Sequence, residues 1–228
     1  MFTIADNIAQ VAARIRAAEQ TAQRAEHSVR LLAVSKTKPS EAVREAYAAG
    51  VHDFGENYLQ EALGKQLELA DLPLCWHFIG PIQSNKTRAI AENFAWVHSV
   101  DRLKIAQRLS EQRPAELPPL NICIQVNVSG ETSKSGCTPA DLPALASAIS
   151  ALPRLKLRGL MAIPEPTEDR AAQDAAFATV QKLQASLNLP LDTLSMGMSH
   201  DLESAIAMGA TWVRIGTALF GARDYGQP

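Results

Sequence analysis

The chain has 228 residues, of which 46% are hydrophobic, and its formal net charge is −2. This length allows one large α/β domain or two small ones, and the nearly balanced charge argues against a nucleic-acid-binding surface. No segment is apolar enough to span a membrane, and the first residues lack the apolar core of a signal peptide. Three cysteines without metal-ligand spacing predict reduced thiols, no metal site and a cytoplasmic protein.

Amphipathic stretches and short apolar runs alternate along the whole chain. An Ala-rich stretch from residue 3 to about residue 25 has apolar residues at helical spacing and predicts an N-terminal helix. Eight strands are expected at residues 31–35, 51–54, 76–79, 96–99, 121–128, 157–161, 193–196 and 212–215. Helices are expected between them at residues 40–49, 58–69, 84–92, 102–111, 140–151, 169–187 and 201–208, with a short one near residue 217.

Eight strands that are each followed by a helix favour a closed parallel barrel over an open doubly wound sheet. We therefore expect residues 1–228 to form a single α/β domain, a (β/α)8 TIM barrel with an extra N-terminal helix. Active sites of this fold lie at the C-terminal mouth of the barrel. Polar residues and glycines that directly follow strands are thus the first functional candidates.

Lys36 ends the first apolar run, and Pro39 follows at a position where a helix can begin. The lysine therefore sits where a core strand opens into a loop at the mouth of the barrel. Desolvation lowers the pKa of an ammonium group, and the neutral amine is the form that attacks a carbonyl. One interpretation is a Schiff-base lysine. The alternative is a lysine that reaches solvent or binds phosphate, and the run alone favours this alternative.

The segments after the last two strands predict a phosphate site. Ser199 is expected to be the N-cap of the helix at 201–208, and Gly216 and Thr217 follow the eighth strand. TIM barrels often bind phosphate with these two loops. The alternatives are an ordinary helix cap and a tight turn. Arg214 interrupts an apolar strand, and its spacing from Gly216 favours a side chain that points into the mouth rather than outward into an ion pair.

The histidines follow no metal-ligand spacing. His77 and His98 lie within apolar strands and are interpreted as core histidines whose hydrogen bonds are satisfied. His52 receives the same interpretation. His200 follows Ser199 and is assigned no role.

Seven stretches, taken together, resemble a known family. They are LAVSKTKP at 32–39, FGENY at 54–58, WHFIGPIQSNK at 76–86, SKSG at 133–136, RGLM at 158–161, SMGMS at 195–199 and VRIGTALFG at 213–221. In order and spacing they are similar to the pyridoxal-phosphate homeostasis proteins, single-domain relatives of the N-terminal barrel of alanine racemase. The resemblance covers nearly the whole chain.

The resemblance implies a set of residues that bind pyridoxal 5′-phosphate (PLP). Lys36 would form the internal aldimine, Arg214 would face the pyridine nitrogen, and Asn57 would belong to the same site. Ser199, Gly216 and Thr217 would hold the phosphate. Lys38 and Lys134 match family lysines near the site and are expected to be secondary PLP lysines.

The implied function is to hold PLP reversibly and deliver it to apo-enzymes, most simply as a monomer without turnover. An arginine at the pyridine nitrogen makes the ring a poor electron sink, and we expect no counterpart of the C-terminal β domain that carries a catalytic tyrosine in alanine racemase. The main alternative is an amino-acid racemase or another small PLP enzyme. A third hypothesis is a barrel with a phosphate site and a lysine that forms no aldimine.

Overall fold

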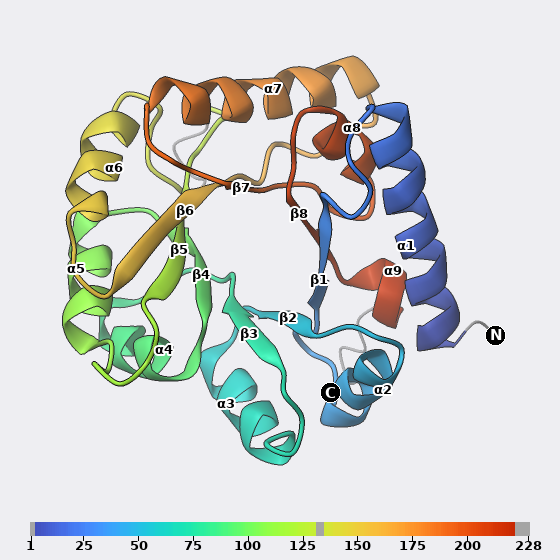
Figure 1. Cartoon of the computed structure of the whole chain (residues 1–228), viewed down its shortest axis with the longest axis horizontal. Helices are drawn as coiled ribbons and strands as arrows, with labels where there is room; N and C mark the ends of the chain where they lie inside the picture. Colours follow the sequence, from blue (N-terminus) through green and yellow to red (C-terminus); the bar gives the residue numbers. More distant parts are fainter. Residues whose placement is uncertain (1–2, 131–134, 222–228) are drawn as a thin grey trace, which may run out of the picture.

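The computed structural model describes residues 3–130 and 135–221. Its centre is a closed barrel of parallel strands that neighbour one another in chain order, and β1 pairs with β8 to close the ring (Figure 1). The strands are β1 Arg30–Val34, β2 Asp53–Glu56, β3 Cys75–Phe78, β4 Trp96–Val100, β5 Leu120–Gln125, β6 Leu155–Met161, β7 Thr193–Ser195 and β8 Trp212–Ile215. The predicted TIM barrel is confirmed, with strand ends shifted by a few residues.

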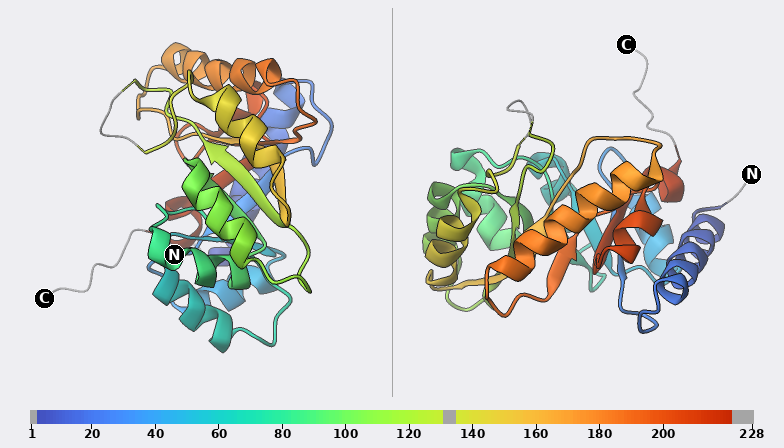
Figure 2. Two further views of the ribbon diagram at one scale, coloured as in Figure 1. Left: turned by 90° about the vertical axis from the view of Figure 1, so that its left-hand side faces the viewer. Right: turned by 90° about the horizontal axis from the view of Figure 1, so that it is seen from above.

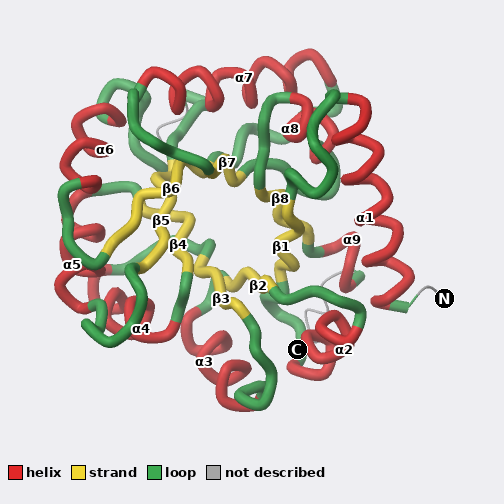
Figure 3. Tube along the Cα trace, in the orientation of Figure 1, coloured by secondary structure: helices red, strands yellow, loops and turns green. Residues whose placement is uncertain are grey.

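The helices form an outer ring around the strands (Figure 3). They are α1 Ile4–Thr21, α2 Ser40–Ala48, α3 Leu59–Glu68, α4 Thr87–Asn93, α5 Leu103–Gln112, α6 Leu142–Ser150, α7 Arg170–Ser186, α8 Leu202–Ala207 and α9 Thr217–Phe220, with the 3₁₀ turn η1 Ser84–Lys86 before α4. Most strand residues are apolar and buried because both faces of the strands are covered. No helix in the described residues is both long and apolar enough to cross a membrane.

One predicted helix is divided in the structure. The stretch expected to be helical from residue 84 begins as η1, and regular α-helix starts only at Thr87. The Thr87 hydroxyl oxygen lies 3.0 Å from the Ser84 carbonyl oxygen and 2.7 Å from Gln112 Oε1, and its one hydrogen is donated to one of these acceptors at a time. These bonds tie the turn to α5 and favour tight 3₁₀ geometry over a full first turn of α-helix.

The N-terminal ends of the strands are closed by two tryptophans and two arginines. Trp96 and Trp212 meet edge to face, with ring centroids 5.9 Å apart. The Arg30 guanidinium lies 4.2 Å from the centroid of Trp212, and that of Arg158 lies 4.7 Å from Trp96. Cation–π contacts of this kind let a charged group cover an apolar core. This end of the barrel is therefore packed shut, and the opposite mouth is left for a ligand.

Helix α1 is the addition to the eight βα units, and it lies against α8 and α9 (Figures 1 and 2). Its apolar face buries Ile8, Val11 and Ile15. The Thr3 side chain accepts the backbone N–H of Asp6 and the Asp6 side chain accepts that of Thr3, which is a capping box. The predicted N-terminal helix is thus confirmed, and it packs against the two helices that follow β7 and β8.

Candidate cofactor site

The C-terminal mouth of the barrel contains a cavity of about 200 Å³, lined by the loops after β1, β2, β7 and β8. The primary cofactor-binding residues predicted from the sequence all line this cavity: Lys36, Asn57, Ser199, Arg214, Gly216 and Thr217. Lys38 and His200 line it as well. Lys134 lies outside the described residues. The structure therefore brings the predicted set together, although the role of each residue stays a prediction.

The backbone on both sides of Lys36 is held by side chains from β2 and α3. The Ser35 hydroxyl donates to Glu56 Oε1 (2.5 Å), and the Ser35 carbonyl oxygen accepts from Lys65 Nζ (2.6 Å). On the other side, the Thr37 N–H donates to Glu61 Oε1 (2.6 Å). Thr37 adopts a left-handed backbone conformation (φ +62°), which a β-branched residue rarely does. These contacts fix the backbone position of Lys36, whose side chain is half-buried.

Lys65 is the centre of this arrangement. Its ammonium group lies 2.7 Å from Glu56 Oε1 and 2.6 Å from Glu61 Oε1, and its side chain is only 6% exposed. Burial raises the pKa of Glu56, although Lys65 and Ser35 act in the opposite direction. Glu56 Oε2 is buried without a hydrogen-bond partner among the described residues. A charge cluster of this kind is costly to desolvate and costly to break.

Arg214 enters the cavity from β8, which confirms the expected inward direction. Nη1 donates to Ser195 Oγ (2.9 Å) and Nη2 donates to the Ala162 carbonyl oxygen (3.0 Å). Burial lowers the pKa of Arg214 to about 10, so the guanidinium remains a cation at neutral pH. The site thus contains a fixed, buried positive charge held by neutral acceptors.

Ser199 is not the N-cap of the following helix, so that prediction is wrong. Helix α8 begins at Leu202, and Asp201 is its N-cap. The Asp201 carboxylate accepts the backbone N–H of Met198 (2.6 Å), which folds the loop back before the helix starts. Gly197 adopts φ +98°, and a Cβ there would lie 2.6 Å from the Cβ of Ala205. Ser199 lies on the cavity side of this turn instead of at the helix end.

Helix α1 is bonded to the loop after β7 and to helix α9, the segments that follow the two strands whose ends were predicted to hold phosphate. Arg14 Nη2 donates to the Ser199 carbonyl oxygen (3.0 Å), and the same guanidinium pairs with Glu203 (2.8 Å). Asn7 Nδ2 donates to the Leu219 carbonyl oxygen in α9 (2.9 Å). Sequence reasoning missed both residues, because polar side chains on one face of a surface helix are typical of solvent exposure.

Gly216 and Asn57 have features that a bound ligand would explain. A Cβ on Gly216 would lie 3.3 Å from the Val34 carbonyl oxygen, so a glycine keeps the backbone open beside the cavity. Asn57 Oδ1 is buried and has no hydrogen-bond partner among the described residues. Buried polar atoms are nearly always paired, so an orphan beside a cavity fits a ligand that donates to it.

The histidine interpretation is correct at two of three positions. His77 and His98 are completely buried and hydrogen-bonded to each other (2.9 Å), whereas His52 is exposed. In the described residues, one group with metal-ligand atom types lies close together: Asp53, Cys75 and His77, within 4.8 Å of one another. Sequence reasoning missed this group because its members come from two strands. The expectation of no metal site stays a prediction.

The sequence of the chain is similar to those of known proteins. Residues 7–224 match the family model described as alanine racemase, N-terminal domain. The chain therefore belongs to the proteins built on that barrel domain. It is 78% identical, over 228 residues, to the pyridoxal phosphate homeostasis protein of Pseudomonas aeruginosa, covering 100% of this chain and 99% of the relative. It is 53% identical to the protein of the same name from Escherichia coli K12, covering 99% of each chain.

The chain thus belongs to the pyridoxal phosphate homeostasis protein family, and the resemblance seen in the sequence is confirmed. Among solved structures, PipY of Synechococcus elongatus PCC7942 with PLP bound has a TM-score of 0.83 at 42% identity, covering 96% of this chain and 100% of PipY. Alanine racemase from Corynebacterium glutamicum has a TM-score of 0.67 at 19% identity, covering 96% of this chain and 62% of the racemase. This second likeness concerns the fold alone.

Proposed function

We propose that the chain binds pyridoxal 5′-phosphate in the mouth of the barrel, as a Schiff base on Lys36, and takes part in intracellular PLP homeostasis. One observation carries the proposal: a single cavity is lined by a lysine amine, a buried arginine and the two loops after β7 and β8. The names of the relatives and the PLP-bound structure of PipY support it. Delivery of the cofactor to apo-enzymes belongs to the same proposal.

The residues of the cavity fit the chemical groups of PLP. Bound PLP would supply an aldehyde, which condenses with a primary amine with loss of water, and Lys36 is the amine at the end of β1. Gly216 leaves the backbone open where a phosphate is expected, and Ser199 and Thr217 bring hydroxyl donors. Arg214 faces the ring nitrogen in this assignment. Asn57 Oδ1, which has no partner among the described residues, would accept from the 3-hydroxyl group of PLP, because the phosphate and the unprotonated ring nitrogen can only accept.

Lys38 is the second amine of the cavity and has the secondary role. It lies two residues after Lys36 on the same loop, and both side chains line the cavity in which the cofactor would be taken up or exchanged. Lys134, which lies outside the described residues, is proposed to share this role. Reversible exchange between amines suits a carrier, because release then needs no more than a competing amine or water.

We further propose that the chain does not turn over amino acids. The Arg214 cation disfavours a proton on the pyridine nitrogen, since two neighbouring cations repel, and an unprotonated ring stabilises a carbanion poorly. Among the described residues that line the cavity there is no tyrosine to act as a second acid–base. The alternative is a PLP-dependent racemase or another small PLP enzyme, and deuterium exchange at Cα of amino acids distinguishes the two.

The test of the proposal is an absorption spectrum of the purified protein with PLP, before and after borohydride, followed by mass mapping of the modified lysine. We expect a visible Schiff-base band that borohydride removes and a pyridoxyl group on Lys36. Lys36→Ala should lose this band, and Lys38→Ala is the matched control that should keep it. An adduct of the wild-type protein on a lysine other than Lys36 contradicts the assignment. Absence of any band favours a phosphate site without a Schiff base.

A further inference from the structure

A line of hydrogen-bonded side chains runs through the barrel from the cofactor cavity to the closed end. Arg214 Nη1 lies 2.9 Å from Ser195 Oγ, which lies 2.7 Å from His98 Nδ1. His98 Nε2 lies 2.9 Å from His77 Nδ1, and His77 Nε2 lies 3.0 Å from Asp53 Oδ1. Asp53 is the first residue of β2 and is 13% exposed, whereas the other four residues are buried. Strands β8, β7, β4, β3 and β2 each contribute one member.

The donor at one end of this hydrogen-bond chain and the acceptor at the other end fix the direction in which its hydrogen bonds run. A guanidinium can only donate hydrogen bonds, and an ionised carboxylate can only accept them. Ser195 accepts from Arg214, so its own hydroxyl hydrogen is available for His98 Nδ1. His98 must then donate from Nε2 to His77, and His77 must donate from Nε2 to Asp53. Neutral histidines that satisfy all of these bonds must both carry the proton on Nε2.

The surroundings favour neutral histidines. Burial lowers the pKa of both, and that of His98 falls well below the ordinary histidine value. The His77 ring stacks on Trp96, with the two planes 8° apart and the centroids 5.5 Å apart. It also meets Trp212 edge to face at 5.0 Å. A hydrogen-bond chain in such dry surroundings is electrostatically strong, and an unpaired member would be costly.

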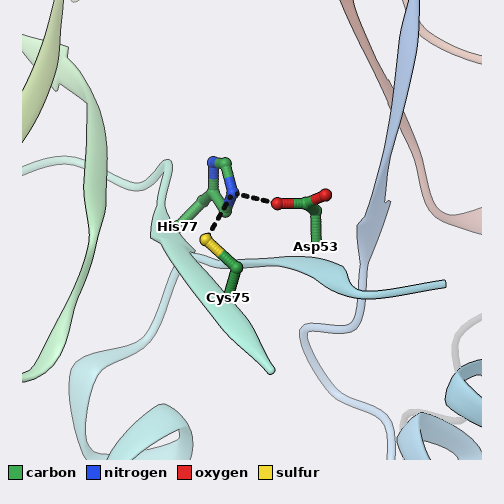
Figure 4. A group of neighbouring side chains, drawn as sticks. All are labelled: Asp53, Cys75 and His77. Atoms are coloured by element: carbon green, nitrogen blue, oxygen red, sulfur yellow. Dashed lines mark hydrogen bonds and ion pairs between the residues drawn. The ribbon is translucent and has the colours of Figure 1, made fainter. Parts of the chain in front are cut away.

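The far end of the chain is shown in Figure 4, where the imidazole of His77 points at the carboxylate of Asp53 and Cys75 lies beside it. Cys75 Sγ is 3.5 Å from His77 Nε2. The second carboxylate oxygen of Asp53 accepts from Arg30 Nη2 (3.0 Å). A metal ion would need the lone pair of His77 Nε2, but this nitrogen is the donor to Asp53. The contacts of Asp53, Cys75 and His77 are therefore those expected at the end of a line of hydrogen bonds.

We infer that Asp53, His77, His98 and Ser195 are positioning residues for Arg214. The carboxylate at the closed end sets the direction of the chain, and this direction leaves a Ser195 lone pair facing the guanidinium. If the hydrogen bonds ran the other way, Ser195 would have to accept from both His98 Nδ1 and Arg214 Nη1, and these contacts would leave no acceptor for its own hydrogen. The effect on PLP binding rests on the proposed function, whereas the direction of the chain does not.

Asp53→Asn is the decisive substitution because Arg30 constrains how the amide can lie. The amide oxygen must face Arg30, which only donates, so the NH₂ group must face His77 Nε2. His77 Nε2 then becomes an acceptor, and the proton moves to Nδ1 in both histidines. The variant therefore keeps the size of the side chain and reverses the donor–acceptor direction of the hydrogen-bond chain. Asp192→Asn is the matched control, because Asp192 pairs with Arg158 at the same end of the barrel and takes no part in the chain.

The measurement is nitrogen NMR of the imidazole and guanidinium groups in PLP-free protein, with PLP titration of each variant. We expect Nε2–H on both histidines in the wild type, Nδ1–H in Asp53→Asn together with a shifted Arg214 Nε resonance, and wild-type spectra in Asp192→Asn. PLP affinity should fall about tenfold or more in Asp53→Asn, as for the loss of a charge-assisted hydrogen bond. Ser195→Ala should lower it similarly and make a further Asp53→Asn change nearly silent.

Three results would overturn the inference. One is Nδ1–H on His77 in the wild type, the tautomer that a metal ion on Nε2 would leave. Another is a reversed chain in Asp53→Asn with the Arg214 resonance and the PLP affinity unchanged. The third is full additivity of Asp53→Asn and Ser195→Ala. If the wild type binds no PLP, the proposed function fails, and the histidine and arginine spectra still decide the inference.

Discussion

Lys65 Nζ lies 2.6 Å from the backbone carbonyl oxygen of Ser35, the residue that precedes Lys36. The same ammonium group bonds Glu56 and Glu61, and Glu61 accepts the N–H of Thr37 on the far side of Lys36. One buried cation thus connects both flanks of the proposed PLP lysine to α3 and β2. Its position implies that the conformation of the Lys36 loop depends on the Lys65 charge that these two glutamates share.

Lys65→Met should destabilise the fold and slow the reaction of Lys36 with PLP. Breaking a buried ion pair leaves Glu56 without its counter-ion, which typically costs about 3–5 kcal/mol in the free energy of unfolding. The double variant Lys65→Met with Glu56→Gln should recover part of this loss, because the fully buried Glu56 side chain is then no longer a charge without a partner. Urea unfolding and the rate of borohydride-trapped adduct measure the two effects. Equal stability of the single and double variants would contradict the role given to Lys65.

The buried histidine pair predicts a loss of stability at mildly acidic pH. His77 and His98 have folded-state pKa values lowered by burial, whereas an unfolded histidine titrates near pH ~6.5. Below pH ~6.5 the unfolded chain therefore binds protons at these histidines, whereas the folded protein does not until the pH reaches the lower folded-state pKa values. Their contribution is fully present above pH ~6.5 and is lost as the pH falls toward the folded-state values, at about 1.4 kcal/mol per pH unit for each histidine.

Urea unfolding between pH 7 and pH 5 checks this prediction. His98→Gln should remove part of the pH dependence even if it lowers stability overall. His52→Gln is the control, because His52 is exposed and should leave the profile unchanged. A wild-type unfolding free energy that stays flat across this window would show that the two histidines take up protons in the folded protein over the same pH range as in the unfolded chain.

The contacts of α1 predict that phosphate binding depends on a helix outside the βα units. Arg14 bonds the Ser199 carbonyl oxygen, and Asn7 bonds the Leu219 carbonyl oxygen. Arg14→Gln and Asn7→Ala should lower the affinity for PLP several-fold and leave that for pyridoxal, which has no phosphate, nearly unchanged. Arg16→Gln is a control with the same charge change on the same helix. Equal losses for both ligands would mean that α1 stabilises the barrel without shaping the phosphate loops.

Two substitutions in the loop after β8 are expected to weaken PLP binding by different amounts. Thr217→Ala removes one hydrogen bond to a charged group and should cost about 1.5–3 kcal/mol of PLP binding. Gly216→Val should cost more, because its Cβ alone would lie 3.3 Å from the Val34 carbonyl oxygen and the larger side chain would crowd β1 beside the cavity. Calorimetric titration with PLP and with pyridoxal measures both. If the wild type binds pyridoxal as tightly as PLP, these loops do not hold phosphate.

The sequence predicted the barrel and the cavity well because strand ends converge in this fold. Lys36, Asn57 and Arg214 follow or end different strands, and parallel strands place such residues at one mouth. The Ser199 cap was predicted wrongly because Asp201, two residues later, is an equally good capping residue and also accepts from Met198. Local sequence does not decide between two adjacent caps.

Other features could not be predicted, because they depend on which face of an element is buried. Glu61 and Lys65 have the spacing of an ordinary exposed helix pair, and only the packing of α3 against β1 and β2 makes the lysine buried. His77 and His98 lie on strands whose two faces are both apolar, so alternation does not show which side chains point into the barrel. The stagger of the strands then brings four side chains from other strands into line with Arg214.

The proposed carrier function predicts that amino acids are not racemised at an enzymatic rate. Racemisation needs a proton removed from one face of Cα and another delivered to the opposite face. Lys36 could serve one face, and the described lining of the cavity has no tyrosine for the other. Missing one positioned acid–base typically costs about 10²–10⁴ in rate, and the Arg214 cation adds a poor electron sink.

Deuterium exchange at Cα of alanine and other common amino acids in heavy water measures this directly. Spectral change on adding an amino acid is not sufficient, because an amine can exchange onto bound PLP without losing its Cα proton. We expect exchange far slower than the typical enzyme turnover of about 10 s⁻¹, and we expect Lys36→Ala to abolish what remains. An alanine racemase assayed in parallel shows that exchange is detectable under the same conditions. Exchange by this protein at about 10 s⁻¹ would reject the carrier function and support the racemase alternative.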